Sequence, residues 1–217
     1  MSDPHATTFD AEFFLDPACP WCWITSRWVT NVQAERDYHV RWRFISLKFI
    51  NEDRTGEYIE RHRQGHMTAL RLMRVLDAVR RAEGNDALAA AYTAIGTEIH
   101  VHKRGDEAAA DARAFAADCL SEAGLDPAHA DAVEDDSHDA ELRAESAEAL
   151  SRTGADVGTP IITFAPGTEH ERSFFGPVIP RAPRGERAVA LWDAVTTLAQ
   201  SDVAELKRTL RGDIVFD

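Results

Sequence analysis

Two cysteines separated by two residues, Cys19 and Cys22 in the run CPWC, have the types and spacing that redox chemistry requires. Pro20 follows Cys19 and suits the first position of a helix, where its missing N–H costs nothing. Cys19 is then the N-cap, with its sulfur facing free backbone N–H groups and the positive end of the helix dipole. That setting lowers a thiol pKa and makes the sulfur nucleophilic near neutral pH. Cys22 lies one turn on, within disulfide reach, so the pair is predicted to be a redox dithiol.

The residues around the dithiol predict a strand before it and a helix after it. Upstream, apolar residues alternate with mostly polar neighbours, which is the period of a strand; they are Phe9, Ala11, Phe13 and Leu15. Downstream, apolar residues three and four apart form a helical stripe; they are Trp21, Ile24, Trp28 and Val32. Residues 40–47 alternate well enough for a second strand, so residues 9–48 are expected to form a βαβ unit with a right-handed crossover.

The middle of the chain, residues 57–150, is rich in Ala, Arg, Glu and Asp, which favours helices. Five are expected, over residues 67–83, 88–104, 108–123, a short one from 126, and 136–153. A strand pattern resumes over residues 157–164, followed by a short strand at 173–176 and a last amphipathic helix at 186–198. The tail, residues 200–217, is expected to carry one helical turn around Leu206 and otherwise to lie on the surface.

The amino-acid composition indicates which partners and which cellular compartment to expect. The chain of 217 residues is 44% hydrophobic with a net charge of −13, which argues against a nucleic-acid surface. Its first ten residues lack the basic start and apolar run of a signal peptide, and no apolar stretch approaches the ~20 residues that span a bilayer. We therefore expect a cytoplasmic protein without membrane contact. Cytosolic thiols are kept reduced, and there a C-x-x-C is catalytic or metal-binding rather than a structural staple.

The order of these elements predicts the fold. Two strands, a helical insert, a Thr-Pro pair, a hairpin and a final helix form an α/β chain with the thioredoxin fold and an inserted α-helical subdomain. We expect a single unit whose core comprises residues 1–52 and 155–217, with residues 53–154 as the insertion. In that plan the Thr159–Pro160 bond is cis and lies beside the dithiol.

Several motifs, spread over the whole chain, resemble one family. They are DPACPWCWITSRW from Asp16, SLKFINEDR from Ser46, YTAIGTEIH from Tyr92, VGTP from Val157, FFGP from Phe174, RGE with LWD from Arg184, and LKRT from Leu206. Together they resemble the DsbA-like (FrnE-like) branch of the thioredoxin superfamily and, within it, the mycothiol-dependent nitroreductase and related mycothiol-dependent disulfide reductases.

The resemblance implies a cytoplasmic enzyme of a mycothiol-making bacterium, with mycothiol as reducing co-substrate and no tightly bound cofactor or metal. Electrons would pass through Cys19, the attacking sulfur, and Cys22, the resolving one, to a small-molecule disulfide or a nitro-aromatic compound. The residues that the resemblance assigns to thiol or substrate binding are Pro20, Trp21, Asn51, His62, Thr159 and Pro160. His62 stands where the family has a pocket tyrosine, with Tyr58 a turn earlier. A homodimer is left open, since no heptad seam is visible.

Other interpretations of the same residues stay open. The dithiol could be half of a zinc site, with His100 and His102 as the only tempting partners, although closed sites need two further ligands. A non-catalytic metal-binding module, a general DsbA-like protein disulfide oxidoreductase and a glutathione-type isomerase are the rival functions; the isomerases typically carry Ser in place of a C-x-x-C. Asp16 is interpreted either as a turn residue or as a proton acceptor for Cys22. Cys119 is expected to be a buried inert thiol, and Trp21 an exposed ring that stacks on a ligand.

Overall fold

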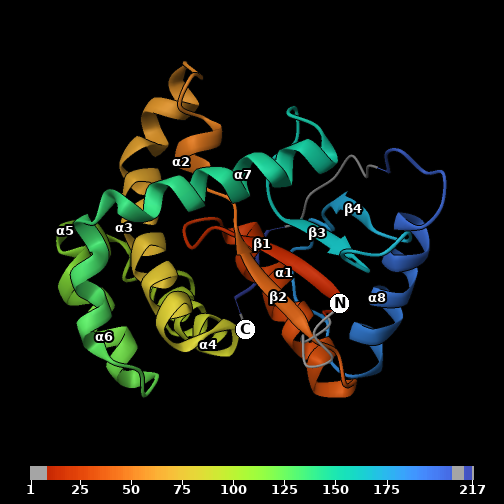
Figure 1. The fold of residues 1–217 in the computed structure, drawn as a ribbon, viewed down its shortest axis with the longest axis horizontal. Coiled ribbons are helices and arrows are strands. Elements are labelled where there is room, and N and C mark those ends of the chain that lie inside the picture. The colour runs from red at the N-terminus through yellow and green to blue at the C-terminus, as the bar shows by residue number, and fades with distance from the viewer. Residues whose placement is uncertain (1–8, 207–212, 217) are drawn as a thin grey trace, which may run out of the picture.

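A four-stranded mixed sheet lies at the centre of the fold, which we describe from a computed structural model of residues 9–206 and 213–216 (Figure 1). Its strands are β1 (Ala11–Leu15), β2 (Val40–Phe44), β3 (Ile161–Phe164) and β4 (Arg172–Phe175), in the order β2-β1-β3-β4. β1 pairs parallel with β2 and antiparallel with β3, and β3 pairs antiparallel with β4. The parallel β1–β2 pair around a helix confirms the predicted βαβ unit.

Side chains of β1 alternate between the two faces of the sheet, as the period of a strand requires. Ala11, Phe13 and Leu15 join the main core, whereas Phe14 belongs to a second, smaller core on the other face. All five residues of β1 are buried because helices cover both faces. The strand therefore ends inside the protein, directly before the CPWC run.

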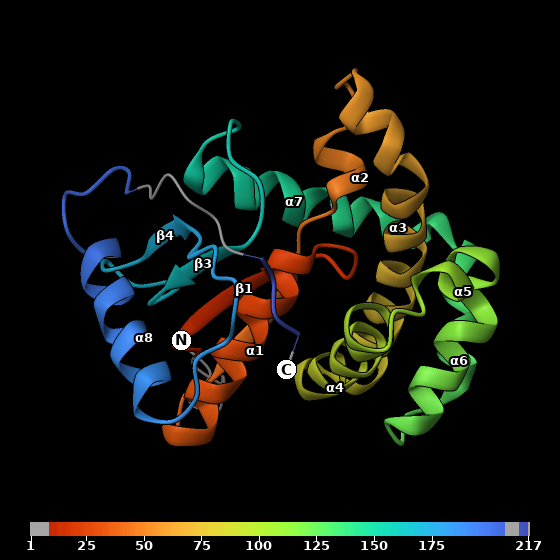
Figure 2. The same cartoon turned by 180° about the vertical axis from the view of Figure 1, so that it is seen from behind.

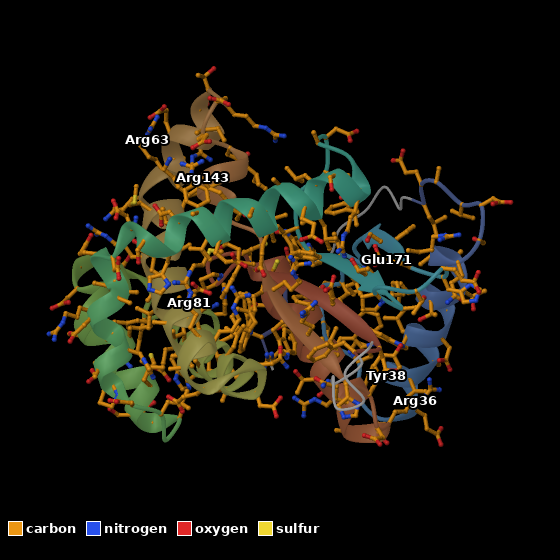
Figure 3. The ribbon with its side chains drawn as sticks, in the orientation of Figure 1. Arg36, Tyr38, Arg63, Arg81, Arg143 and Glu171 are labelled. Atoms are coloured by element: carbon orange, nitrogen blue, oxygen red, sulfur yellow. The ribbon has the colours of Figure 1, made fainter. Side chains whose placement is uncertain are left out.

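Helices α1 (Pro20–Glu35) and α8 (Glu186–Ala199) pack together beside the main core. Trp28 is fully buried, as predicted, and its indole N–H donates to the carbonyl oxygen of Ala188 at 2.9 Å. Arg36 follows the last residue of α1 and is labelled in Figure 3. It donates to both carboxylate oxygens of Asp193 on α8, at 2.6 and 2.7 Å. These contacts hold α1 in place over its length.

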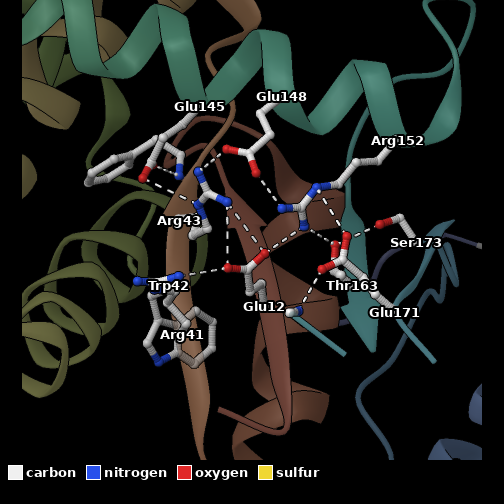
Figure 4. A network of polar contacts seen from close by, with 12 residues as sticks. Glu12, Arg41, Trp42, Arg43, Glu145, Glu148, Arg152, Thr163, Glu171 and Ser173 are labelled. Carbon is white, nitrogen blue, oxygen red and sulfur yellow. Dashed lines mark hydrogen bonds and ion pairs between the residues drawn. The ribbon is translucent and has the colours of Figure 1, made fainter. Parts of the chain in front are cut away.

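The other face of the sheet carries a buried ion network under helix α7 (Asp139–Thr153) (Figure 4). Glu12 of β1 accepts hydrogen bonds from Arg41, Arg43 and Arg152. Burial alone would raise the pKa of this carboxyl, but the three guanidinium groups hold it below its ordinary value. Glu145 of α7 also accepts from the backbone N–H of Phe44 at 2.8 Å. The network fastens α7 to the sheet.

The elements described between β2 and β3 are all helical. They are α2 (Leu47–Ile50), α3 (Glu57–Glu83), α4 (Asn85–Gly96), the π-helix η1 (Thr97–Val101), α5 (Gly105–Ala110), α6 (Ala112–Glu122), the 3₁₀ helices η2 (Pro127–Glu134) and η3 (Asp136–His138), and α7. Figure 1 shows α3 to α6 gathered on one side of the sheet, with α7 crossing above it. The segment 53–154 that the sequence assigns to the insertion contains α3 to α7.

One expectation about helices needs correction, and another concerns residues that are mostly outside the described part of the chain. The single helix expected over residues 108–123 is two, because Asp111 interrupts it and caps α6 by accepting from the N–H of Ala114 at 2.9 Å. The helical turn expected around Leu206 is absent at that residue, and residues 207–212 lie outside the described part of the chain. Residues 200–206 of the tail are exposed, as expected, whereas Ile214 and Phe216 are half-buried against the main core. Among the described residues, no helix is long and apolar enough to cross a bilayer.

Candidate active site

Cys19 is the N-cap of α1, and Pro20 occupies the first helical turn, as predicted. The Cys19 backbone is extended, and its sulfur accepts a hydrogen bond from the backbone N–H of Cys22 at 3.4 Å. Both cysteines are free thiols in this structure. The Cys19 sulfur thus lies at the positive end of the helix dipole, where a thiolate is stabilised.

Cys22 is the more deeply buried of the two cysteines. It is fully buried on the first turn of α1, and its sulfur lies 3.7 Å from the carbonyl oxygen of Phe14 at the end of β1. Burial raises its pKa well above the ordinary value, and donation to Cys19 raises it further. The same S–H, donated to Cys19, is the main reason that the pKa of Cys19 is lowered. The two thiols are therefore unequal: Cys19 is the one poised to ionise.

Thr159 is 140 residues away from Cys19 in the sequence, but its side chain lies in this site. Its hydroxyl donates to the Cys19 sulfur at 2.9 Å, which also lowers the pKa of Cys19. The Thr159–Pro160 bond is cis, as expected for the thioredoxin plan, and β3 begins directly after it. Strand β3 pairs with β1, so the sheet itself brings Thr159 to the cysteines.

Asp16 is buried beneath the loop that carries the cysteines. One carboxylate oxygen accepts from the N–H of Ala18 at 2.9 Å and the other from the N–H of Leu47 at 2.8 Å. Asp16 therefore is a turn residue, and it also ties this loop to the start of α2. Burial raises its pKa to about 6, and its negative charge raises the pKa of both cysteines. Its second interpretation, a proton acceptor for Cys22, stays a prediction.

His100 belongs to this site, although the sequence suggested it only as a tempting partner in a zinc site. It is buried on η1, and its Nε2 lies 2.8 Å from the carbonyl oxygen of Pro17 in the active-site loop. Its ring stacks on that of Trp23, with centroids 5.6 Å apart. Gly96, one turn earlier, leaves room for this packing, because a Cβ there would lie 2.3 Å from the Trp23 ring. His100 is the last residue of the YTAIGTEIH motif, so the sequence did contain a signal for it. Its role could not be predicted from the motif, because that role depends on a contact with the distant loop at Pro17.

Asn51 directly follows α2, and His62 lies on α3. The Asn51 side chain donates to the Leu47 carbonyl oxygen at 2.8 Å and lines a small cavity of about 30 Å³ together with His66. His62 stacks on His66 with ring centroids 6.1 Å apart but does not line that cavity. His66, which the sequence did not single out, is therefore the histidine beside Asn51. The side chain of Tyr58 lies outside the described residues.

The remaining candidates behave as follows. Trp21 is half-buried rather than fully exposed, and Pro20 is half-buried beside it. Cys119 is buried, and burial raises its pKa to about 12, which fits an inert thiol. His102 pairs with Glu98 at 2.7 Å, away from the cysteines. Among the residues that the structure describes, no group of three His, Cys, Asp or Glu side chains is arranged to hold a metal ion.

The mixed sheet, the helical insertion and the N-capping dithiol beside a cis-proline define a thioredoxin-superfamily protein of the DsbA-like type. A solved structure with the same fold is that of the cytosolic disulfide reductase DsbM from Pseudomonas aeruginosa, with a TM-score of 0.56, 16% identity, 87% of this chain and 99% of that one covered. The structure of that reductase with GSH matches with a TM-score of 0.55 and 16% identity, over 87% and 99% of the two chains. At this identity the likeness concerns the fold.

Sequence comparison identifies the family. The model of the Rv2466c-like family, described as mycothiol-dependent nitroreductase Rv2466c, matches residues 18–208, so this chain belongs to that family. Rv2286c of Mycobacterium tuberculosis (strain ATCC 25618 / H37Rv), described as uncharacterized, is 33% identical over 200 residues, which are 91% of this chain and 80% of that protein. The family and the unequal cysteine pair support an oxidoreductase of the thiol–disulfide type.

Proposed function

We propose that this protein is a cytoplasmic oxidoreductase that draws electrons from mycothiol and delivers them, through Cys19 and Cys22, to small-molecule disulfides and nitro-aromatic compounds. The observation that carries the proposal is the inequality of the two thiols. Cys19 has a lowered pKa and Cys22 a raised one. A low-pKa thiol attacks well at neutral pH, and a protonated neighbour waits until a mixed disulfide has formed.

The reaction on a disulfide begins with the Cys19 thiolate. It attacks one sulfur of the substrate, the substrate S–S bond breaks, and the second sulfur leaves as a thiolate that takes a proton from water. Cys22 then loses its proton and attacks the Cys19 sulfur, which releases the first half of the substrate and closes the Cys19–Cys22 disulfide. Asp16, whose charge acts on both thiols, is the buried base proposed to receive the Cys22 proton. Two electrons have passed from the dithiol to the substrate.

Mycothiol closes the cycle. One molecule attacks Cys19 of the enzyme disulfide, which forms a Cys19–mycothiol mixed disulfide and frees Cys22 as a thiol. A second molecule attacks the mycothiol sulfur, which yields mycothiol disulfide and reduced Cys19. For a nitro-aromatic compound, the dithiol would supply two electrons and two protons to convert the nitro group to a nitroso group and water. Trp21, half-buried between the cysteines, and Asn51 are the residues proposed to contact the substrate or thiol.

The test is the intact mass of the reduced Cys22→Ser variant after exposure to mycothiol disulfide. We expect one mycothiol adduct, located on Cys19 by peptide mapping, and in the wild-type protein the loss of two hydrogen atoms as the Cys19–Cys22 disulfide closes. Cys19→Ser is the matched control and should carry no adduct, because Cys22 has a raised pKa and Cys119 is buried.

Other outcomes would overturn parts of the proposal. Rapid reaction with a peptide disulfide but not with mycothiol disulfide would favour a general protein disulfide oxidoreductase. Reaction only with glutathione disulfide would keep the dithiol chemistry and remove mycothiol. No reaction with any disulfide, together with metal in protein purified without chelator, would favour the metal-binding module.

A further inference from the structure

His100 contacts the middle of the active-site loop, at Pro17. The turn from Asp16 to Cys19 is closed by the Cys19 N–H, which donates to the Asp16 carbonyl oxygen at 3.2 Å. His100 Nε2 lies 2.8 Å from the carbonyl oxygen of Pro17 inside that turn. A carbonyl oxygen only accepts, so the imidazole proton must be on Nε2. Burial lowers the pKa of His100 to about 4, so the ring is neutral at pH 7 and this is its single N–H.

The His100 ring is held in turn by two aromatic neighbours from opposite ends of the chain. One is Trp23, directly after Cys22, with centroids 5.6 Å apart and an angle of 23° between the planes. The other is Phe216, with centroids 5.9 Å apart and an angle of 12°. Arg27 adds a cation to the group, 4.3 Å from the Trp23 ring centroid. The chain's last described residue is thus part of a stack that begins next to the dithiol.

Two contacts keep Phe216 in that stack. The Lys103 ammonium lies 3.7 Å from the centroid of the Phe216 ring and donates to the His100 backbone carbonyl oxygen at 2.5 Å. A cation over an aromatic face is attracted by the ring's electrons. On the other side, the N–H of Val215 donates to the carbonyl oxygen of Pro180 at 2.8 Å.

The segment at Pro180 is itself anchored to α1. The hydroxyl of Thr25 on α1 donates to the carbonyl oxygen of Pro177 at 3.0 Å. Residues 213–216 therefore touch the insertion, through His100 and Lys103, and the core, through Pro180. Figure 2 shows this last described segment passing near the start of α1 and ending beside α4.

We propose that residues 213–216 form a strap that holds the redox site, with Phe216 and His100 as positioning residues for the Cys19 thiolate. Through Pro17, the strap keeps the Cys19 sulfur within reach of the donors that stabilise its charge, the Thr159 hydroxyl and the Cys22 N–H. Both donors depend on where the loop places the sulfur. Loosening the strap lets the loop move, weakens both hydrogen bonds and reduces the fraction of Cys19 that is ionised. The inference rests on the proposed role of Cys19 as the attacking thiol.

The test is the rate at which iodoacetamide alkylates Cys19 in the reduced protein, measured by peptide mass spectrometry. The thiolate displaces iodide, so the rate reports the ionised fraction when the pH lies below the thiol pKa. For Phe216→Ala we expect the rate at about pH 6 to fall about threefold, and the rate at about pH 9, where the thiol is ionised in both proteins, to stay within error. Phe216→Tyr keeps the ring and should restore the wild-type rate at both pH values.

The control is Leu206→Ala, a truncation of a 68% exposed side chain in the same tail, which should leave the rate unchanged. Phe216→Leu keeps apolar bulk without the ring and replaces the alanine variant if that variant does not fold. An unchanged rate at about pH 6 in Phe216→Ala, or in Phe216→Leu where it replaces the alanine variant, would overturn the strap. A loss of rate at both pH values would also overturn it, because that indicates general loosening. If wild-type Cys19 reacts no faster than Cys22, the proposed role of Cys19 fails instead, so the two failures are distinct.

Discussion

Replacing Asp16 by Asn is expected to change the pH dependence of stability in a direction that the structure determines. Asp16 is fully buried, and its pKa is raised by burial from 3.8 to about 6. Between these two values the folded protein holds a proton that the unfolded chain has released. Stability therefore falls as the pH rises through this window and levels off above it. Asn carries no charge, so this component disappears in the variant.

The size of the effect follows from the two pKa values. Each unit of difference between the folded and unfolded pKa values corresponds to about 1.4 kcal/mol. An ionised Asp16 therefore costs the folded state about 3 kcal/mol above pH 7. The variant also loses something at every pH, because the Asn side chain has one accepting oxygen for the two backbone N–H groups, of Ala18 and Leu47, that Asp16 satisfies. An unsatisfied buried N–H costs about 1–3 kcal/mol. The variant should be less stable than wild type at low pH and equally or more stable at high pH.

The assay is urea unfolding of both reduced proteins between about pH 4.5 and about pH 8. The difference between them isolates Asp16, since other groups titrate alike in both. We expect it to move by about 2 kcal/mol in favour of the variant across this range, because the first part of the cost has already developed below about pH 4.5. Asp37→Asn, at an exposed position, is the matched control and should give a constant difference. A constant difference for Asp16→Asn as well would refute the reasoning, because it would mean that the carboxyl titrates alike in the folded and unfolded chains.

Three other substitutions test the site and its supports. Thr159→Val removes the hydroxyl that donates to Cys19 at 2.9 Å; it should raise the pKa of Cys19 and slow its alkylation at about pH 6 by about fivefold, while Thr159→Ser keeps the wild-type rate. Gly96→Ala places a Cβ 2.3 Å from the Trp23 ring; it should lower the free energy of unfolding by about 1–3 kcal/mol in urea, and an unchanged value would contradict this close packing. Glu12→Gln leaves the three arginines of the buried network without their shared carboxylate; a loss of about 3 kcal/mol is expected, and a loss below about 0.5 kcal/mol would show that the network contributes little.

Much of this site could be predicted from residues close together in the chain. The position of Cys19 at the helix start, with Pro20 after it, depends on backbone groups within one turn, and the structure confirms it. The alternation of β1 and the stripe of α1 likewise depend on periods of two and 3.6 residues, which a sequence displays directly. The end of α3 at Gly84 follows from the positive φ of that residue, which glycine adopts without a Cβ penalty.

Predictions failed or fell short where a residue's environment comes from distant segments. The local sequence predicts that Asp16 is a turn residue, which is correct. Its pKa is raised, however, because α2 and the loop bury the carboxyl group. The sequence suggests His100 only as a zinc partner, whereas the fold places it 2.8 Å from Pro17. The tail is exposed over residues 200–206, as expected, but Phe216 is half-buried because it stacks on His100.

The sequence by itself determined the dithiol, the helix that presents it and the family, because these depend on local backbone groups and on motifs that can be read along the chain. Only the tertiary structure decided which thiol ionises and what holds it. The donor from Thr159 comes from 140 residues away, and desolvation depends on every segment that packs around a group. Those quantities exist only once the chain has folded.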